Sequence, residues 1–314
     1  MRVEKAIVVR RSTRLEELVR RFNTRAQAKF YIEHAGGDFS DYEIEDSNYR
    51  RALDEVQSSL ESITKVQVID RFFMPNFVFG EHQVIVAVGQ DGLVANAAKY
   101  VGGRPIVGVN PDPSRFDGIL LPFTPRNAAC GVRDLMSGTA AGRPITMAEV
   151  VLQDRQRLLA FNDFFIGARS HVSARYRISF QDRSENQSSS GVLVSTGAGS
   201  TGWLSSVFNM AAAVGALAGS QPDLVRRPEV EWDERRLIFV VREPFVSRGS
   251  GADIAAGTVD DQSVLKLESQ MPQHGVIFSD GVESDYLAFN SGASATVQIA
   301  PESAHLVIPP TRDR

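Results

Sequence analysis

The chain of 314 residues is long enough for about two ordinary domains, at ~150 residues each. Lys and Arg number 34, Asp and Glu 38, and the resulting net charge of −4 excludes a general polyanion binder, so we expect no nucleic-acid partner. The single cysteine, Cys130, excludes a disulfide framework and a cage of thiolate zinc ligands, and we interpret it as a buried or idle thiol.

No segment reaches the ~18 consecutive apolar residues that a membrane span requires. The first residues also lack the apolar core of a signal peptide, and the five histidines show no metal-ligand spacing. These observations predict a cytoplasmic protein with no membrane contact and no metal site built from its own side chains.

The first 125 residues alternate helical and strand-like patterns. Val3–Val9 has the pattern of a strand, and Thr13 with Glu16 forms a capping box that opens a helix. A second helix is expected near Tyr49–Ile63, and buried strands are predicted at Val66–Ile69, Val84–Val88 and Arg104–Val109. Continuous apolar strands separated by helices favour a parallel sheet covered on both faces. We therefore predict an α/β domain over residues 1–125.

Residues 126–299 have the pattern of a β-rich, mostly antiparallel domain that begins near Pro122–Asn127. Ala174–Phe180 alternates apolar and polar residues strictly, as a half-buried antiparallel strand does. Gln187–Ser190 is interpreted as a polar turn, and Trp203–Leu217 as an apolar helix. Further strands are expected at Gly191–Ser195, Arg236–Val241, Val264–Leu267, Gly275–Phe278 and Ala295–Ile299.

The first candidate for chemistry is the run Gly89-Gln90-Asp91-Gly92, which lies between a predicted strand and a helix-like segment. A glycine-bounded turn into a helix presents backbone N–H groups and the positive helix end to an anion. Asp91 is the one side chain of this run that can take a proton from a hydroxyl. The alternative is an ordinary Asp-Gly turn in which the aspartate caps the helix.

A second candidate, Ser195–Trp203, interleaves hydroxyls with glycines at another strand-to-helix junction. Such hydroxyls can hydrogen-bond phosphate or ribose oxygens. Its glycines match the dinucleotide fingerprint literally, but the next strand-like run begins only near residue 236, so the required βαβ unit is missing. Ser200 narrowly misses a nucleophile elbow and has no evident histidine partner.

The third candidate is the polar pair Asn162 and Asp163, which lies between Phe161 and Phe164. Burying such groups costs free energy unless each one is hydrogen-bonded. The pair therefore either ties down its own turn or binds a ligand, and taken alone the residues favour the turn.

Together and in this order, the three segments resemble the NAD kinase family. Gly89–Gly92 is similar to the family's GGDG loop, Asn162–Asp163 to its Asn-Glu pair, and Thr196–Trp203 to its Thr-Gly-Ser-Thr-Ala-Tyr stretch. The mitochondrial-type branch is the more similar one, on Gly108–Arg115, Phe164–Gly167, Ser189–Gly191, Arg242–Arg248 and Asp280-Gly281. Gln90 departs from the family's second glycine, and Ser190 stands where common bacterial members have an aspartate.

The resemblance implies an α/β domain followed by a β-rich domain, with the C-terminal tail, residues 300–314, packed back on the first. It also implies an activity, in which the γ-phosphoryl group of ATP is transferred to the 2′-hydroxyl of the adenosine ribose of NAD to give NADP. Mg²⁺ would accompany ATP, and the protein would be a homo-oligomer.

Roles for individual residues follow from the same resemblance. Asp91 would accept the proton of the 2′-hydroxyl, while Gly89, Gln90 and Gly92 would hold the ATP phosphates. Asn162 would bind the adenine of NAD and Asp163 the nicotinamide-side ribose. The remaining NAD-binding residues would be Thr201, Gly202, Trp203 and Ser206, with Arg248 and Asp280 as further candidates.

Two other functions remain open on the sequence. One is a related kinase that phosphorylates a lipid or sugar hydroxyl, because the glycine-rich loop is shared more widely than the acceptor site. The other is a dinucleotide-binding protein without turnover, which Gln90 and Ser190 alone favour.

Overall fold

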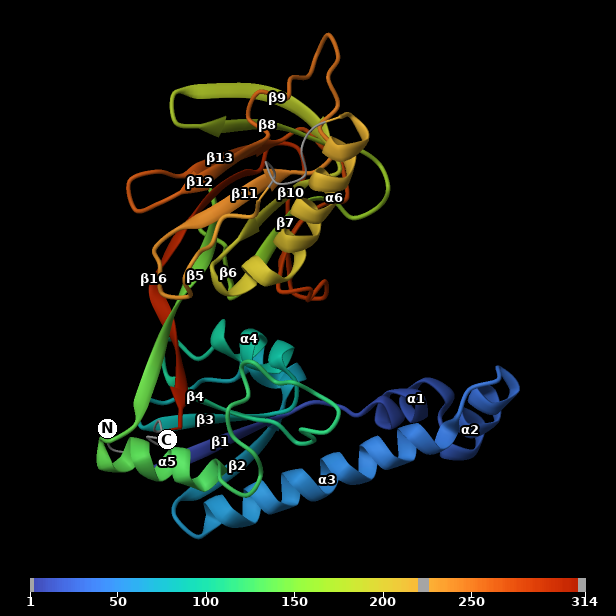
Figure 1. Ribbon diagram of the computed structural model, residues 1–314, viewed down its shortest axis with the longest axis vertical. Coiled ribbons are helices and arrows are strands. Elements are labelled where there is room, and N and C mark those ends of the chain that lie inside the picture. The colour runs from blue at the N-terminus through green and yellow to red at the C-terminus, as the bar shows by residue number, and fades with distance from the viewer. Residues whose placement is uncertain (1–2, 220–225, 310–314) are drawn as a thin grey trace. The chain divides into compact units, whose positions relative to one another are not determined.

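The computed structural model describes residues 3–219 and 226–309, which form two compact units (Figure 1). Unit 1 is Met1–Arg143 with His305–Arg314, and unit 2 is Pro144–Ala304. Residues 126–143, assigned to the second domain by the sequence interpretation, belong to unit 1, because α5 (Ala128–Ser137) packs Ala128, Ala129 and Val132 into its core. Residues 310–314, the end of the predicted C-terminal tail, lie outside the described residues.

The core of unit 1 is a parallel sheet whose strands follow the order β2-β1-β3-β4-β16. Arg10, at the end of β1, is in register with Asp70 of β2 and with Val88 of β3. The carboxyl ends of three neighbouring strands therefore lie along one edge. The strands are β1 (Lys5–Arg10), β2 (Lys65–Asp70), β3 (Gln83–Val88), β4 (Pro105–Val109) and the end of β16 (Ser294–Ile308).

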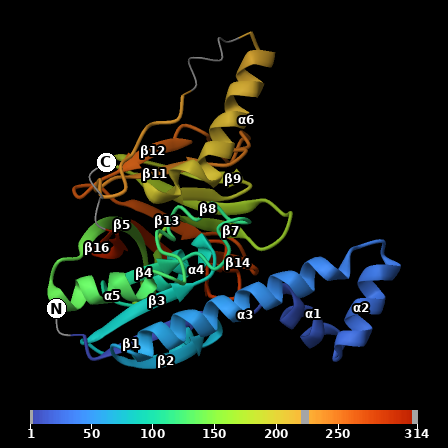
Figure 2. The same ribbon diagram turned by 60° about the horizontal axis from the view of Figure 1, so that its bottom comes forward.

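Helices cover both faces of this sheet. α3 and α5 bury Tyr49, Val56 and Val132 against one face, and α4 lies on the other (Figure 1). Figure 2 shows α3 running along the strands and on to α1 and α2, which pack with Phe39 at its start. Besides α5, the helical elements are α1 (Arg14–Phe22), α2 (Arg25–His34), α3 (Phe39–Glu61), η1 (Arg71–Asn76) and α4 (Asp91–Ala98).

Unit 2 is a sandwich of two sheets that share one apolar core, in which Tyr176, Phe164 and Phe239 are fully buried. One sheet continues from the first part of β16 in the order β13 (Leu265–Ser269), β8 (Ala174–Phe180) and β9 (Arg183–Ser189). On its other side β16 pairs with β5 (Ala141–Leu152), which in turn pairs with β6 (Arg157–Ala160). The other is antiparallel, in the order β12 (Ala256–Val259), β11 (Leu237–Val241), β10 (Val192–Ser195), β7 (Asp163–Ala168), β14 (Gly275–Ser279) and β15 (Tyr286–Ala288).

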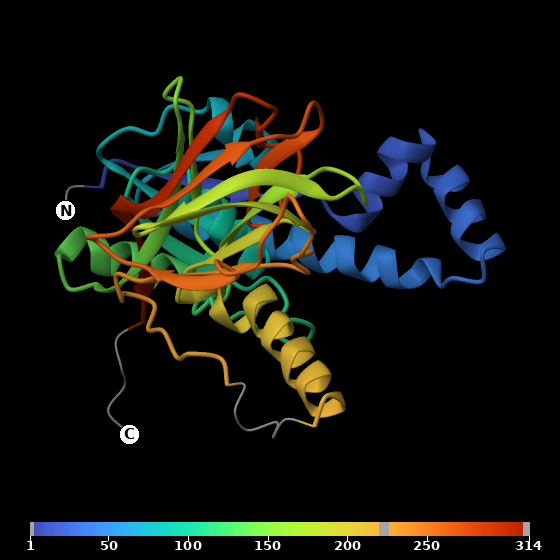
Figure 3. The same cartoon turned by 90° about the horizontal axis from the view of Figure 1, so that it is seen from above.

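A short helix, η2 (Ala198–Thr201), and the longer α6 (Trp203–Leu217) follow β10. α6 packs its first turn on the second sheet, where Leu204 meets Leu193 and Ile238. Its later turns carry exposed apolar side chains and extend away from the strands, as the yellow helix of Figure 3 shows.

These elements confirm the predicted fold class, a parallel α/β unit and a β-rich antiparallel unit. The predicted turn at Gln187–Ser190 is wrong, because Gln187 and Ser189 belong to β9. Both are buried, and both are hydrogen-bonded by the hydroxyl of Tyr176. The Cys130 thiol is exposed on α5 rather than buried. No helix of the described residues is long and apolar enough to span a bilayer.

Candidate active site

Asp91 is the first residue of α4 and comes three residues after the end of β3. Its carboxylate does not cap its own helix. Instead Oδ1 accepts a hydrogen bond from the backbone N–H of Leu120 at 2.8 Å, and Oδ2 accepts one from Ile119 at 3.3 Å. A carboxylate offers about four acceptor positions, so the side chain is oriented by a neighbouring loop and keeps positions for another donor.

The loop that orients Asp91 is itself fixed by side-chain hydrogen bonds and close packing. Asn110 is buried, donates from Nδ2 to the carbonyl of Phe116 at 2.8 Å, and accepts at Oδ1 from the N–H of Asp112. A Cβ on Gly108 would overlap the carbonyl oxygen of Leu120, so only glycine lets β4 approach the loop this closely. The position of the Asp91 carboxylate is therefore set by a loop that Gly108 and Asn110 hold in place.

The glycines beside Asp91 have different surroundings. A Cβ on Gly89 would lie 2.9 Å from Cδ2 of Leu93, whereas one on Gly92 would meet nothing within 4 Å. Gln90, between Gly89 and Asp91, is exposed. The open space at Gly92 leaves the first turn of α4 accessible to a bound group, and its N–H groups are suited to an anion.

In unit 2, the turn that carries Asn162 and Asp163 is held by two other residues. The carboxylate of Asp280 accepts from the N–H of Phe161 at 3.0 Å and of Asn162 at 2.6 Å. Thr196 donates from Oγ1 to the carbonyl of Phe161 at 2.6 Å and from its N–H to the carbonyl of Asn162 at 2.9 Å. The interpretation that Asn162 and Asp163 tie down their own turn is thus wrong. Neither side chain forms a hydrogen bond with any residue that the structure describes.

The pKa of Asp163 is raised to about 7, mainly because the carboxyl group is buried and to a smaller extent because of the negative charge of Asp280. An unfolded aspartate has a pKa of about 4. The folded state therefore prefers the protonated carboxyl group of Asp163. The stabilisation from this preference is fully present below about pH 4, and the free energy of unfolding falls as the pH rises from there to about 7.

Asp163→Asn is therefore expected to stabilise the protein at pH 8, by on the order of 2–4 kcal/mol. The variant should also lose part of the decline in stability between pH 4 and pH 7. Denaturant unfolding at several pH values measures both effects. The exposed Asp182 gives the matched control, Asp182→Asn, which should keep the wild-type pH profile. If Asp163→Asn kept it as well, Asp163 would not titrate with a raised pKa.

The hydroxyl- and glycine-rich segment packs against the same turn. Ser195 is the strand partner of Asp163, and a Cβ on Gly199 would overlap the carbonyl oxygen of Asn162. Thr201, Gly202 and, on the first turns of α6, Ser206 are exposed beyond this contact. In contrast, Ser200 is buried and accepts a hydrogen bond from Arg227 at 2.7 Å, so it is not available as a nucleophile.

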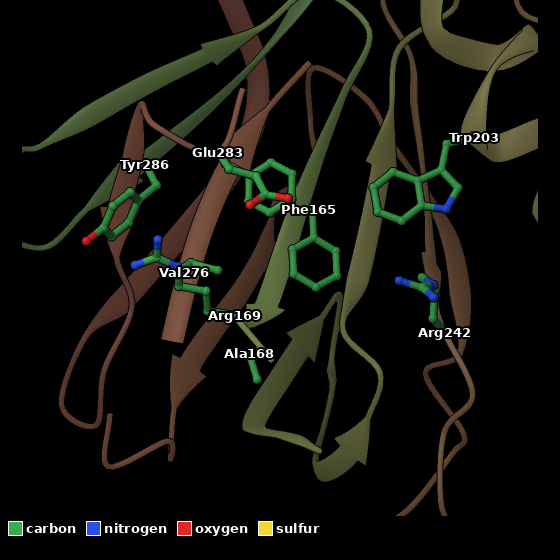
Figure 4. A pocket seen from close by; sticks show the side chains of 9 residues that line it. Phe165, Ala168, Arg169, Trp203, Arg242, Val276, Glu283 and Tyr286 are labelled. Atoms are coloured by element: carbon green, nitrogen blue, oxygen red, sulfur yellow. The ribbon is translucent and has the colours of Figure 1, made fainter. Parts of the chain in front are cut away.

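Trp203 forms one wall of a pocket of about 180 Å³ in unit 2 (Figure 4). Its ring stacks on Phe165 at 5.8 Å between centroids and 11° between planes, and the guanidinium of Arg242 lies 5.1 Å from the Trp203 centroid. Such a wall suits a flat aromatic ligand. The other lining residues are Ala168, Arg169, Val276, Phe278, Glu283 and Tyr286.

Most of these pocket residues were not predicted. Phe165 and Arg242 lie within segments that carry the family resemblance, but neither had been given a role. Arg169 and Tyr286 carry no signal in the sequence, because only the pairing of β7 with β14 and of β14 with β15 brings them together.

The predicted site residues thus form two groups. Gly89, Gln90, Asp91 and Gly92 belong to unit 1, and Asn162, Asp163, Thr196–Trp203 and Asp280 gather at one corner of unit 2. Arg248 is exposed in a turn closed by Ser247 and Ser250. In the part of the chain that is described, no three His, Cys, Asp or Glu side chains cluster as metal ligands.

The fold is that of NAD kinases. The structure is similar to yeast NADH kinase solved with NADH, with a TM-score of 0.60 and 13% identity over 98% of this chain and 84% of that one. It is also similar to an NAD kinase from Archaeoglobus fulgidus solved with ATP, with a TM-score of 0.54 and 17% identity over 96% and 92% of the two chains. No protein-family model and no curated protein matches the sequence.

Proposed function

We propose that this protein is an NAD kinase, which transfers the γ-phosphoryl group of ATP to the 2′-hydroxyl of the adenosine ribose of NAD. The observation that carries the proposal is the pair Asn162 and Asp163. Their turn is already held by Asp280 and Thr196, so both side chains remain available to bind a ligand. The shared fold supports the same activity.

In this proposal Asp91 is the general base. Its two backbone hydrogen bonds hold the carboxylate in one orientation, and a free acceptor position takes the proton of the 2′-hydroxyl. The ribose oxygen then bonds to the γ-phosphorus, the bond from that phosphorus to the β–γ bridging oxygen breaks, and ADP leaves.

The substrates are assigned to residues as follows. Gly89, Gln90 and Gly92 contact the phosphates of MgATP, in which the metal is held mainly by phosphate oxygens and water. Asn162 binds the adenine of NAD, and Asp163 the nicotinamide-side ribose. Trp203 and its neighbours Thr201, Gly202 and Ser206 line the adenosine pocket, and we further expect a cytoplasmic homo-oligomer.

The test is to incubate the purified protein with MgATP and, side by side, NAD, a diacylglycerol and a sugar. We expect phosphorylation of NAD alone. Phosphorylation of the lipid or the sugar in preference to NAD would replace the proposal by the related kinase. Binding of NAD without consumption of ATP would replace it by a non-catalytic dinucleotide-binding protein.

Trp203→Ala is expected to raise KM for NAD about fivefold and KM for ATP much less, because stacking of an aromatic group is worth about 1 kcal/mol. Steady-state kinetics with each substrate varied in turn measures both constants. The other tryptophan gives the control variant Trp232→Phe, which should leave both constants unchanged. Equal increases of the two constants in Trp203→Ala would show that Trp203 only packs the core.

A further inference from the structure

A second pocket, of about 540 Å³, lies within unit 1 at the carboxyl ends of its strands. Arg11 follows β1, Arg71 follows β2, and Gln90 comes two residues after the end of β3, and all three line the pocket. The chain passes from β1 to β2 on one side and places β3 on the other side of β1. Open parallel sheets bind ligands at such a reversal of strand order.

The pocket carries a net positive charge. Its lining includes four arginines and two glutamates, which gives a net charge of +2 from these residues. Asp41 pairs with Arg14 and Arg115 from outside the lining and leaves a net charge of +1. The lining residues are Arg11, Ser12, Arg14, Glu17, Glu45, Arg71, Gln90, Arg115 and Phe116. A concave surface of one charge attracts ligands of the opposite charge.

Arg11 is fixed in place at this edge. Its backbone N–H donates to the hydroxyl of Tyr49 at 2.9 Å, and that hydroxyl donates to the carbonyl of Val88 at 2.8 Å, which joins the ends of β1 and β3. The guanidinium donates to Glu45 at 2.7 Å, and Arg14 pairs with the same carboxylate. The side of the pocket formed by α1 and α3 is therefore an ordered ion-pair network.

Arg71 and Gln90 differ from the other arginines of the pocket, which are ion-paired, and the exposed Glu17 is the one further polar lining residue whose side chain has no partner among the described residues. Arg71 and Gln90 are both exposed, and neither side chain has a hydrogen-bond or ion-pair partner among residues 3–219 and 226–309. Arg71 is held at its backbone, because Asp70 caps η1 by accepting from the N–H of Phe72 and also pairs with Arg10. A guanidinium with no partner and a free amide thus face the pocket next to the loop that contains Asp91.

We propose that this pocket binds a linear oligophosphate chain, with Arg71 and Arg115 as its phosphate contacts and Gln90 as an added donor. This inference rests on the proposed function, because it identifies how the phosphate donor is held beyond the glycine-rich loop. Arginine binds phosphate oxygens in a bidentate fork, and an amide donates to the same oxygens. A glutamine in place of a glycine at position 90 then adds a contact to the donor.

Isothermal titration of the full chain with ATP and with inorganic tripolyphosphate tests the inference. Arg71→Gln and Arg115→Gln are each expected to raise Kd for both anions about tenfold, the value of one charge-assisted hydrogen bond. Higher salt should weaken binding to the wild type more than to the variants. The exposed Arg126 of unit 1 gives the control, Arg126→Gln, which should bind as the wild type does. Wild-type Kd values for both anions in Arg71→Gln and Arg115→Gln would overturn the inference.

The two proposals fail in different ways. Binding of tripolyphosphate that depends on Arg71, without any NADP formed, would support the pocket and refute the kinase. Formation of NADP with an unchanged KM for ATP in Arg71→Gln and Arg115→Gln would support the kinase and refute the pocket. Loss of affinity for ATP and tripolyphosphate alike would show that the phosphate chain itself is recognised, whereas loss for ATP alone would assign the site to a nucleoside triphosphate.

Discussion

Asp91→Asn is expected to lower kcat for NADP formation by roughly 10²–10⁴, the usual contribution of a positioned general base. The amide cannot take the proton of the 2′-hydroxyl. Its oxygen can still accept from the N–H of Leu120, so the loop should keep its position. Initial rates at saturating NAD and MgATP measure the effect, and the thermal midpoint should change little.

The exposed Asp54 on α3 gives the matched control, Asp54→Asn, which removes the same charge from unit 1 away from the loop. We expect wild-type kcat for this variant. A near-wild-type kcat in Asp91→Asn would exclude Asp91 as the base, and an equal loss in both variants would assign the effect to net charge.

Gly199→Ala is expected to have the second large effect, because the added Cβ would overlap the backbone carbonyl of Asn162, which cannot move without breaking the bond to Thr196. Overlap of this kind costs roughly 1–3 kcal/mol or more. The variant should unfold at a lower temperature, and its KM for NAD should rise because the turn with Asn162 and Asp163 shifts. Thermal unfolding and steady-state kinetics measure the two changes.

Gly249→Ala is the control in the same unit, since its Cβ would meet no atom within 4 Å. Its unfolding temperature and KM for NAD should match the wild type. If Gly199→Ala behaved in the same way, the close packing of η2 on the Asn162 turn would not position the site.

Much of the fold could be predicted from hydrophobic periodicity, because the apolar pattern records which face of each element is buried. The continuous burial of Val84–Val88 and the strict alternation of Ala174–Phe180 both correspond to the observed strands. The capping box of Thr13 and Glu16 is present in both directions. In contrast, β9 was missed because its Gln187 and Ser189 are polar, and hydrogen bonds with residues distant in sequence, among them the Tyr176 hydroxyl and the carbonyl of Ile254, compensate for their burial.

The site could be predicted only in part, since long-range contacts decide the roles of its residues. The motif around Asn162 was visible, but whether its side chains are used by their own turn depends on Asp280, which lies 118 residues away. The orientation of Asp91 likewise depends on Leu120, and the isolated guanidinium of Arg71 depends on the register of β1 with β2. None of these pairings is encoded by local spacing.

The most direct measurement is the position of the phosphate in the product. The purified protein is incubated with MgATP and either NAD or an NAD analogue that lacks the 2′-hydroxyl of the adenosine ribose, and the products are examined by ³¹P NMR. We expect a 2′-phosphomonoester from NAD, none from the analogue, and none from NAD with Asp91→Asn. Phosphorylation of the analogue, or no phosphorylated dinucleotide from NAD, would contradict the role of Asp91 and the assignment of NAD as the acceptor.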